Sequence, residues 1–212
     1  MKEIIEAYFN QRSLVNHQLA SYDDCIPSGD GSEVRMNRME NIVRDLLSLS
    51  KIELQEHIRP EKKVDIKKII SSVIEMNNEI LKKNEIQAEL KAPDNEYEIL
   101  GEQDRLTEVF SNLIDNAAKY SKKGKKIFVK VENNEEFVIV SIKDQGIGIP
   151  KEYIHRVTER FFRVNPSKSK DVGGTGLGLA IVKHIINQHR ADMEIKSEEG
   201  VGTEFILIFP AI

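Results

Sequence analysis

The sequence of 212 residues contains a single cysteine, Cys25, which excludes an intramolecular disulfide and suits a reducing compartment. It lacks any apolar run near the roughly 18 residues that a membrane-spanning helix needs, and it lacks a signal peptide. It also lacks a strong charge of one sign, because the formal net charge is only −4. Nucleic acid is therefore not an expected partner, and the basic run at 122–126 is interpreted as a solvated turn. These absences predict a cytoplasmic chain, which would be the soluble part of its parent if that parent is anchored in a membrane.

The first 60 residues are predicted to form a helical hairpin. Apolar residues recur at helical spacing over 2–22, a breaker run follows at 25–32, and a long helix is expected over 33–57. The long helix carries an apolar stripe with steps of three and four residues, made of Met36, Met39, Val43, Leu46, Leu47 and Ile52. Such a hairpin usually buries its stripe against a partner, so we expect a homodimer with a second copy of the chain.

Residues 61–212 have the pattern of an α+β domain. Helical periodicity runs over 65–84 and 103–120, and returns after a glycine-rich run in the stretch that ends at 190. Alternation of apolar and polar residues predicts strands at 85–90, 96–101, 126–133, 136–144, 192–198 and 202–210. The expected fold is a two-layer α/β sandwich, in which a mixed sheet carries helices on one face.

The helix at 103–120 has a polar side with a chemically suggestive composition. Asn112, Asn116 and Lys119 are spaced i, i+4 and i+7, so they share one face of the helix. Amide oxygens can bind Mg²⁺, and a lysine can meet the charge of a phosphate. A metal–phosphate ligand is one interpretation of this face, and an ordinary solvated helix surface is the other.

The run "DQGIGIP" follows a predicted strand. Gly146 and Gly148 permit backbone geometries that other residues resist and allow a ligand to approach closely. Asp144 offers a carboxylate to a donor such as an exocyclic amine. On its own the run is a weak signal, and a turn is the alternative.

The run "GGTGLGLAIVKHI" leads directly from glycines into an apolar helix. Backbone N–H groups at the N-terminus of a helix form an anion site. The run is not a P-loop, because no Gly-Lys-Ser/Thr follows, and the strand that should precede a dinucleotide fingerprint is missing. The glycines concerned are Gly173, Gly174, Gly176 and Gly178.

Taken in order, these runs resemble the signature of the sensor histidine kinases. "NLIDNAAKY" resembles the N box of that family, "DQGIGIP" the G1 box, "ERFFRV" the F box, "GGTGLGLAI" the G2 box and "GTEF" the closing strand. The resemblance covers residues 62–212 and implies the GHKL, or Bergerat, ATP-binding fold. Upstream, "RMNRMENIVRDLLSLSKIE" resembles the second helix of the family's dimerisation hairpin. Within the family, the phosphate-regulon sensor kinases of alphaproteobacteria look most similar.

The resemblance implies ATP and Mg²⁺ as ligands and suggests a role for single residues. It implies that Asn116 binds the metal, that Asp144 accepts a hydrogen bond from the adenine amino group, and that Thr203 joins this network through water. Gly146 and Gly148 would shape the adenine pocket. The other implied nucleotide contacts are Asn112, Lys119, Tyr120, Gly174, Thr175, Gly176, Leu177 and Gly178.

The implied reaction is transfer of the γ-phosphoryl group to a protein side chain. Related ATPases such as gyrase, the ninety-kilodalton heat-shock chaperones and the mismatch-repair MutL proteins activate water with a glutamate one helical turn before the metal asparagine. Asn112 stands at that position here, which argues against attack by water, and Glu108 one turn earlier is left open as an assisting base. Lys119 and Arg163 would act on the transferred charge, and a lid is implied at 164–175.

The identity of the phosphoacceptor is an open question. The candidate is His17 in "VNHQL", which resembles "VSHEL" of the family. However, Gln18 replaces the expected carboxylate and Tyr22 the expected proline. The breaker at Pro27 also comes sooner than the about 18 residues that five helical turns require. We therefore favour an ordinary helical histidine at His17 over an acceptor.

Residues 1–32 also resemble the opening of the second-largest RNA polymerase subunit of archaea and eukaryotes, so they could be a foreign segment. Three functions remain. The first is the catalytic part of a two-component sensor kinase, which serves a response-regulator receiver domain. The second is an ATP-binding module without autophosphorylation. The third is a serine kinase of the anti-sigma-factor type, which the stem helix disfavours because those kinases lack one.

Overall fold

The structure, a computed structural model, describes residues 31–93, 95–164 and 174–212. Packing of the chain divides it into two units, of which the first ends at Glu40 and the second is Asn41–Ile212. Of the first unit, only the beginning of helix α2 (Gly31–Gln55) is described. His17, the predicted helix at 2–22 and the breaker run lie outside the described residues, and the domain boundary at 60/61 remains a prediction.

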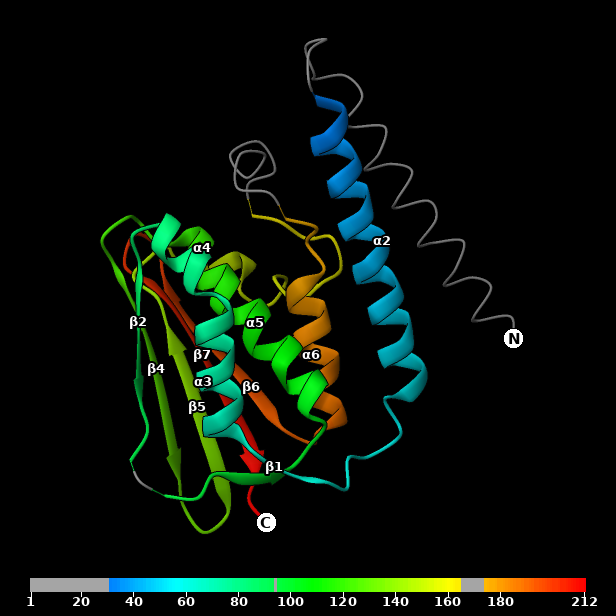
Figure 1. The fold of residues 1–212 in the computed structure, drawn as a ribbon, viewed down its shortest axis with the longest axis vertical. Coiled ribbons are helices and arrows are strands. Elements are labelled where there is room, and N and C mark those ends of the chain that lie inside the picture. The colour runs from blue at the N-terminus through cyan, green and yellow to red at the C-terminus, as the bar shows by residue number, and fades with distance from the viewer. Residues whose placement is uncertain (1–30, 94, 165–173) are drawn as a thin grey trace. The chain divides into compact units, whose positions relative to one another are not determined.

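The second unit is built on a five-stranded mixed sheet (Figure 1). The strand order is β2-β4-β5-β7-β6, in which β2 runs parallel to β4 and all other neighbours are antiparallel. The strands are β2 (Gln87–Lys91), β4 (Lys126–Asn133), β5 (Phe137–Lys143), β6 (Asp192–Glu198) and β7 (Gly202–Pro210). A separate antiparallel pair is formed by β1 (Lys63–Asp65) and β3 (Glu98–Leu100).

Helices cover one face of the sheet (Figure 1), so the predicted two-layer α/β sandwich is confirmed. They are α3 (Ile66–Met76), α4 (Asn78–Lys83), α5 (Gln103–Tyr120) and α6 (Gly178–Gln188), with a 3₁₀ turn, η1 (Lys151–Tyr153). Alternate strand residues such as Val129, Val140 and Leu207 are fully buried beneath them. Val140 lies opposite Leu207 in the register, so the inner face is a continuous apolar layer, as period-2 patterning requires.

The prediction of one helix over 65–84 is wrong, because the structure has two helices there. Asn77 ends α3 with φ −88° and ψ 4°, and α4 begins at the next residue. The Asn77 side-chain amide donates to the carbonyl oxygen of Val73 at 2.9 Å. Asparagine side chains compete in this way for backbone hydrogen bonds, so the apolar periodicity continues across a break in the helix. The short strand β1 directly before α3 was also not expected.

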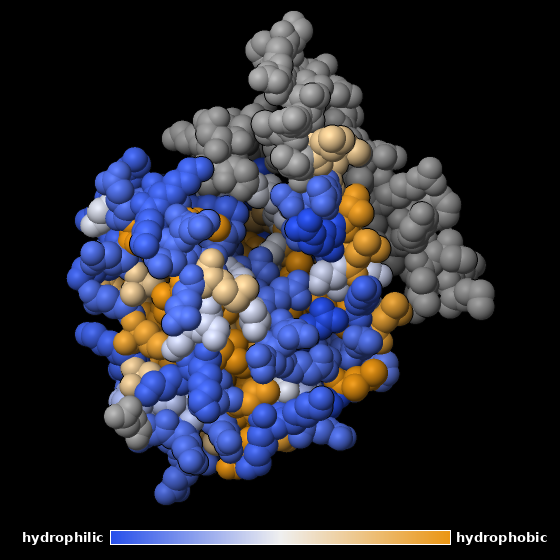
Figure 2. All heavy atoms as spheres, viewed as in Figure 1, coloured by the Kyte–Doolittle hydropathy of each residue, from blue (hydrophilic) through white to orange (hydrophobic). Residues whose placement is uncertain are grey.

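Helix α2 has two different faces. Met36, Met39, Val43 and Leu47 of the predicted apolar stripe are exposed, and apolar side chains are visible along α2 in Figure 2. Ile52, also assigned to that stripe, is instead fully buried together with Leu49. The exposed part of the stripe is what a dimerisation surface would require, and the homodimer remains a prediction. Among the described residues, no helix is both long and apolar enough to cross a membrane.

Candidate functional site

Asp144 stands just beyond the end of β5 and is buried, with 6% of its surface exposed. Its Oδ1 atom accepts hydrogen bonds from the backbone N–H of Gly146 at 2.8 Å and of Thr203 at 3.1 Å. The Thr203 hydroxyl is in turn 2.9 Å from the Ser197 hydroxyl. Burial raises the pKa of the Asp144 carboxyl, and the two N–H donors oppose that rise. Thus the structure brings Asp144, Gly146 and Thr203 together, as the resemblance implied.

Position 148 requires a glycine, because the G1 loop passes very close to the backbone at Glu198. Its φ is +69°, and a Cβ atom there would overlap the backbone carbonyl of Glu198. The neighbouring Ile147 N–H donates to the carbonyl oxygen of Tyr120 at 3.2 Å, and Gly146 forms a β-bridge with Ser121. The G1 loop is therefore held between the end of α5 and the β6–β7 turn.

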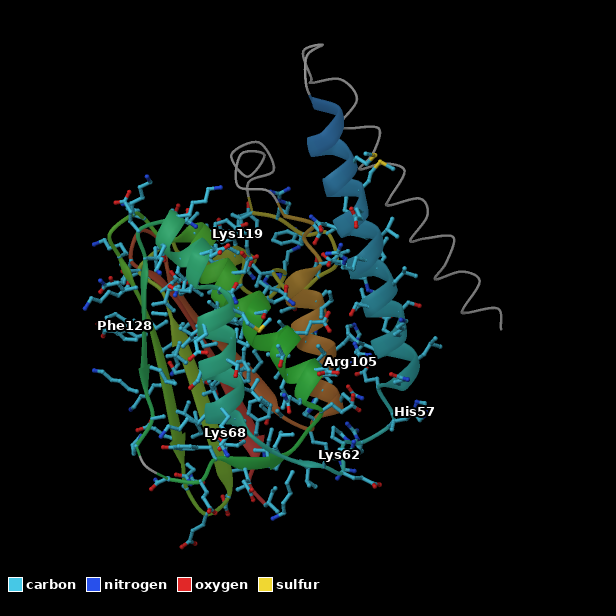
Figure 3. The ribbon with its side chains drawn as sticks, viewed as in Figure 1. His57, Lys62, Lys68, Arg105, Lys119 and Phe128 are labelled. Atoms are coloured by element: carbon cyan, nitrogen blue, oxygen red, sulfur yellow. The ribbon has the colours of Figure 1, made fainter. Side chains whose placement is uncertain are left out.

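The polar side of α5 presents the predicted N-box residues. The Asn112 side chain donates to the carbonyl of Glu108 at 3.0 Å, while its Oδ1 faces Gly178, where a Cβ atom would lie 2.6 Å away. Asn116 is half-buried one turn later. Lys119 lies close to the C-terminal end of α5 (Figure 3) and forms an ion pair with Asp115 at 2.5 Å.

The G2 segment lies at the start of α6 and is tied to the F box. The N–H of Phe161 donates to the carbonyl of Gly176 at 2.8 Å, and a guanidinium nitrogen of Arg163 donates to the carbonyl of Gly174 at 3.1 Å. The Thr175 hydroxyl accepts from the N–H of Leu177 at 3.2 Å. Because the Leu177 side chain is fully buried, the backbone is the part of this residue that a ligand could meet.

The arrangement therefore joins three chain segments that are far apart in sequence. A buried carboxylate follows β5, an amide-rich helix face lies on α5, and a glycine-rich segment opens α6. Tyr120, at the end of α5, is exposed, and its backbone carbonyl contacts the G1 loop at Ile147. Most of the implied lid at 164–175 lies outside the described residues, and only Val164, Gly174 and Thr175 of it are described.

A family model described as histidine kinase-, DNA gyrase B- and HSP90-like ATPase matches residues 101–212. The chain belongs to this ATPase family. The sensor histidine kinase WalK of Bacillus subtilis is 36% identical over 175 residues, which is 82% of this chain and 28% of the relative. The phosphate regulon sensor protein PhoR of Pseudomonas aeruginosa is 36% identical over 181 residues, which is 81% of this chain and 39% of the relative.

A solved structure gives the same assignment. The mycobacterial sensor histidine kinase MprB superposes with a TM-score of 0.60 at 29% identity, covering 70% of this chain and 96% of that chain. The predicted GHKL fold and the resemblance to sensor histidine kinases, with a phosphate-regulon sensor among the relatives, are thus confirmed. The chain spans well under half the length of WalK and PhoR.

The ATPase domain also contacts the second half of the stem helix α2, through residues that sequence analysis missed. The Asp45 carboxylate accepts from the Thr175 hydroxyl at 2.6 Å, and the Ser48 hydroxyl donates to Glu108 at 2.7 Å. Glu53 pairs with Arg160. The stem residues in contact recur every three or four positions, which is the signal that could have revealed them: Asp45, Ser48, Leu49, Ile52, Glu53 and Glu56.

Glu108 was left open as an assisting base, and the structure turns it toward the stem. One of its carboxylate oxygens accepts from Ser48, and the other forms an ion pair with Arg105 at 3.4 Å. Arg105 lies near the opposite end of α5 from Lys119 (Figure 3). Both carboxylate oxygens of Glu108 are therefore engaged, one by the stem residue Ser48 and one by Arg105, and its part as an assisting base remains a hypothesis.

Two histidines of the ATPase domain have defined structural surroundings. His189 is buried, its Nδ1 donates to the carbonyl of Ile185 at 2.8 Å, and its Nε2 accepts from the N–H of Glu102 at 3.1 Å. Burial lowers the pKa of His189, which suits a neutral imidazole that both donates and accepts. His184 lies 3.0 Å from the Glu56 carboxylate of the stem. His189 is therefore a buried packing residue, whereas His184 faces the stem.

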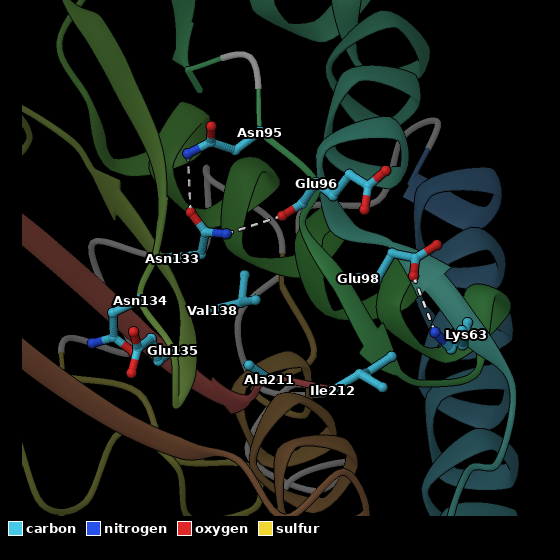
Figure 4. A pocket seen from close by; sticks show the side chains of 10 residues that line it. All are labelled: Lys63, Asn95, Glu96, Glu98, Asn133, Asn134, Glu135, Val138, Ala211 and Ile212. Carbon is cyan, nitrogen blue, oxygen red and sulfur yellow. Dashed lines mark hydrogen bonds and ion pairs between the residues drawn. The ribbon is translucent and has the colours of Figure 1, made fainter.

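An open pocket of about 660 Å³ lies elsewhere, close to β1, β3 and the C-terminal residues (Figure 4). It is lined by polar side chains such as Glu96, Asn133 and Lys63 and contains none of the residues predicted to bind nucleotide. Asn133 donates to the carbonyl of Glu96 at 3.0 Å, and Lys63 pairs with Glu98 at 3.4 Å, so its polar groups largely satisfy one another.

Proposed function

We propose that this chain is the ATP-binding catalytic part, with a portion of the stem, of a two-component sensor histidine kinase. It binds Mg-ATP and presents the γ-phosphoryl group to a histidine. A nitrogen–phosphorus bond forms, the bond to the bridging oxygen breaks, and ADP leaves. The phosphoryl group then passes to an aspartate of a response-regulator receiver domain. The observation that carries the proposal is the buried Asp144 carboxylate at the G1 loop of a chain that is 36% identical to WalK.

The Asp144 carboxylate is suited to select adenine. Both hydrogen bonds described for it go to Oδ1, from the N–H groups of Gly146 and Thr203. Within the described part of the chain, Oδ2 is therefore left to accept from the exocyclic amine of adenine. Guanine presents a carbonyl oxygen at the equivalent position, and two acceptors would then face each other in a buried site. The arrangement thus favours ATP over GTP, and Thr203 supports it through a bridging water.

The phosphates would lie between the polar side of α5 and the start of α6. Backbone N–H groups at Gly174, Gly176 and Gly178 supply donors, and the N-terminus of α6 adds its positive dipole end. Lys119 contacts phosphate oxygens after it leaves Asp115, which is 2.5 Å away in this structure. Arg163 reaches the γ-phosphate and stabilises the charge in transfer.

Mg²⁺ fits the donor chemistry of this region. The described residues contain no cluster of three or more His, Cys, Asp or Glu side chains that could hold a metal alone. Mg²⁺ is usually held by one or two protein oxygens together with phosphate oxygens and water. The amide oxygen of Asn116 supplies the protein's share, and the bound metal would neutralise charge on the phosphates.

We further propose that the chain acts as a homodimer in the cytoplasm, as part of a membrane-anchored parent. Support for the dimer comes from the exposed apolar side chains of α2, namely Met36, Met39, Val43 and Leu47. The response regulator is the partner expected from the relatives' description as sensor kinases.

The test is incubation with γ-labelled ATP and Mg²⁺, for the chain and for His17→Ala. We expect ATP to bind in both, and we expect little acid-labile label, because the sequence around His17 departs from the acceptor pattern. A separately supplied hairpin bearing an intact acceptor histidine should then become labelled. Absence of ATP binding would refute the proposal as a whole.

An ATP-binding module without transfer activity is the alternative, and the altered surroundings of His17 favour it. In that case ATP binds, but neither the chain nor the added hairpin becomes labelled. Acid-labile label that disappears in His17→Ala would instead make the chain a self-contained histidine kinase.

A further inference from the structure

The stem helix sends a carboxylate into the region assigned to the phosphates of the nucleotide. Asp45 of α2 is partly buried, and its carboxylate accepts from the Thr175 hydroxyl at 2.6 Å. Thr175 belongs to the G2 segment, directly between Gly174 and Gly176. An acidic side chain at a loop that is to receive a highly charged anion is opposed to that anion by simple electrostatics.

We propose that Asp45 determines the nucleotide preference of the site by competing with the terminal phosphate of ATP for the G2 segment. This inference rests on the proposed function, because it requires the G2 segment to bind phosphates. While Asp45 holds Thr175, the stem stays docked and the site accepts ADP more readily than ATP. Binding of ATP requires the Asp45–Thr175 hydrogen bond to break.

The local hydrogen bonds explain why the contact competes with phosphate. The Thr175 hydroxyl donates to Asp45 and at the same time accepts from the N–H of Leu177 at 3.2 Å. That N–H lies at the entrance to α6, among the backbone donors that an anion would use. Asp45 therefore holds Thr175 in a position where the Thr175 hydroxyl oxygen occupies the N–H of Leu177. A phosphate oxygen would otherwise bind that N–H.

The electrostatic surroundings point the same way. Burial raises the pKa of the Asp45 carboxyl, while the hydrogen bond from Thr175 and the positive charges of Arg44 and Lys119 lower it. Lys119, which is predicted to contact phosphate oxygens, is therefore among the cations that stabilise the charged form of Asp45.

One other stem contact supplies a matched control. Ser48, one turn further along α2, donates to Glu108 on α5, and no side-chain hydrogen bond joins it to the described G2 residues. Ser48→Ala therefore removes a stem contact of similar kind without removing a charge near the phosphates. Asp45→Asn removes the charge while keeping a hydrogen-bond acceptor, and Asp45→Ala removes both.

The experiment is calorimetric titration of the full chain and of Asp45→Asn, Asp45→Ala and Ser48→Ala with Mg-ATP and with Mg-ADP, after thermal melting has shown that each variant folds. Both Asp45 variants should improve the affinity for ATP relative to ADP by about fivefold, the size of one partly screened charge interaction. Ser48→Ala should leave the ratio of the two affinities unchanged.

Other results would overturn the inference. An unchanged ratio in both Asp45 variants would mean that the carboxylate does not oppose the terminal phosphate. Weaker ATP binding in Asp45→Asn would make Asp45 a ligand of the bound metal instead of a competitor. If the unaltered chain bound neither nucleotide, the proposed function would fail and the inference with it, and that result differs from binding with an unchanged ratio.

Discussion

Replacing Asp144 with asparagine should have opposite effects on nucleotide binding and on stability. The new side chain can keep its Oδ1 as acceptor for the N–H groups of Gly146 and Thr203, which lie at 2.8 and 3.1 Å in the native protein. Its Nδ2 then replaces Oδ2 and points a donor at the amino group of adenine, which is also a donor. A hydrogen bond to a charged group contributes about 1.5–3 kcal/mol, so ATP should bind about 10- to 150-fold more weakly.

The same change should leave the free energy of unfolding equal or higher at neutral pH. Burial raises the pKa of Asp144 in the folded state above its usual 3.8. A carboxyl with a raised folded-state pKa contributes stability below pH 3.8, and that contribution is lost as the pH rises through the folded-state pKa. The stability of Asp144→Asn relative to the native chain should therefore increase between acid and neutral pH, because the asparagine does not titrate.

The measurements are calorimetric titration with ATP and thermal melting over a series of pH values. Asp192→Asn is the matched control, since Asp192 is exposed on the edge strand β6 and should change neither quantity. If Asp144→Asn bound ATP within twofold of the native chain, adenine recognition by this carboxylate would be refuted. If it melted at a lower temperature at pH 7, the reasoning from burial would be wrong.

Three further changes test other parts of the structure. Gly148→Ala should destabilise the domain by more than the about 1 kcal/mol of a left-handed alanine, because its Cβ meets the Glu198 carbonyl. Gly124→Ala is the control, because Gly124 also has a positive φ (+74°) but nothing lies within 4 Å of an added Cβ atom. Its free energy of unfolding in urea should fall only by the cost of the left-handed backbone. His189→Phe should lower the free energy of unfolding by about 1–3 kcal/mol, because the N–H of Glu102 loses its hydrogen-bond acceptor. Its melting temperature should also depend less on pH below 6.5, where the native chain loses stability because the folded-state pKa of His189 is lowered and protonation favours unfolding. Asn116→Ala should weaken binding of Mg-ATP and leave metal-free ATP binding in chelator unchanged, whereas equal loss in both conditions would argue against a metal ligand.

Sequence analysis predicted the elements whose periodicity is set by the core. The helix at 103–120 and the strands at 126–133, 192–198 and 202–210 occur with those bounds, because each presents a regular apolar face to one continuous core. The break at Asn77 was not predictable in this way. A side chain that competes for one backbone carbonyl changes the helix without changing the apolar pattern.

The candidate site also contains residues that the sequence predicts and residues that it does not. Asp144, Gly148 and the N-box residues could be proposed because each belongs to a short run that resembles a box of the sensor histidine kinases. The stem contacts were missed because they pair polar residues that are up to 131 positions apart, as Glu56 and Asn187 do. The predicted apolar stripe along 33–57 consists mostly of exposed residues of α2, and it includes only Ile52 of the second face, on which Leu49 and Ile52 lie among charged and hydroxyl side chains.

The two faces of α2 suggest how docking of the ATPase domain can be reversible. At about 100° per residue, Asp45, Leu49 and Ile52 lie on one side of the helix, and the exposed Val43 and Leu47 lie on the other. The polar stem contacts are partly solvated, so each contributes at most about 1 kcal/mol. Full burial of Leu49 and Ile52 contributes about 1.5–3 kcal/mol each. Docking therefore depends mainly on two apolar side chains, while the polar contacts fix its register. An interaction of this size is within reach of the binding free energy of a nucleotide, so occupancy of the site and release from the stem can be coupled without disturbing the opposite face of the helix.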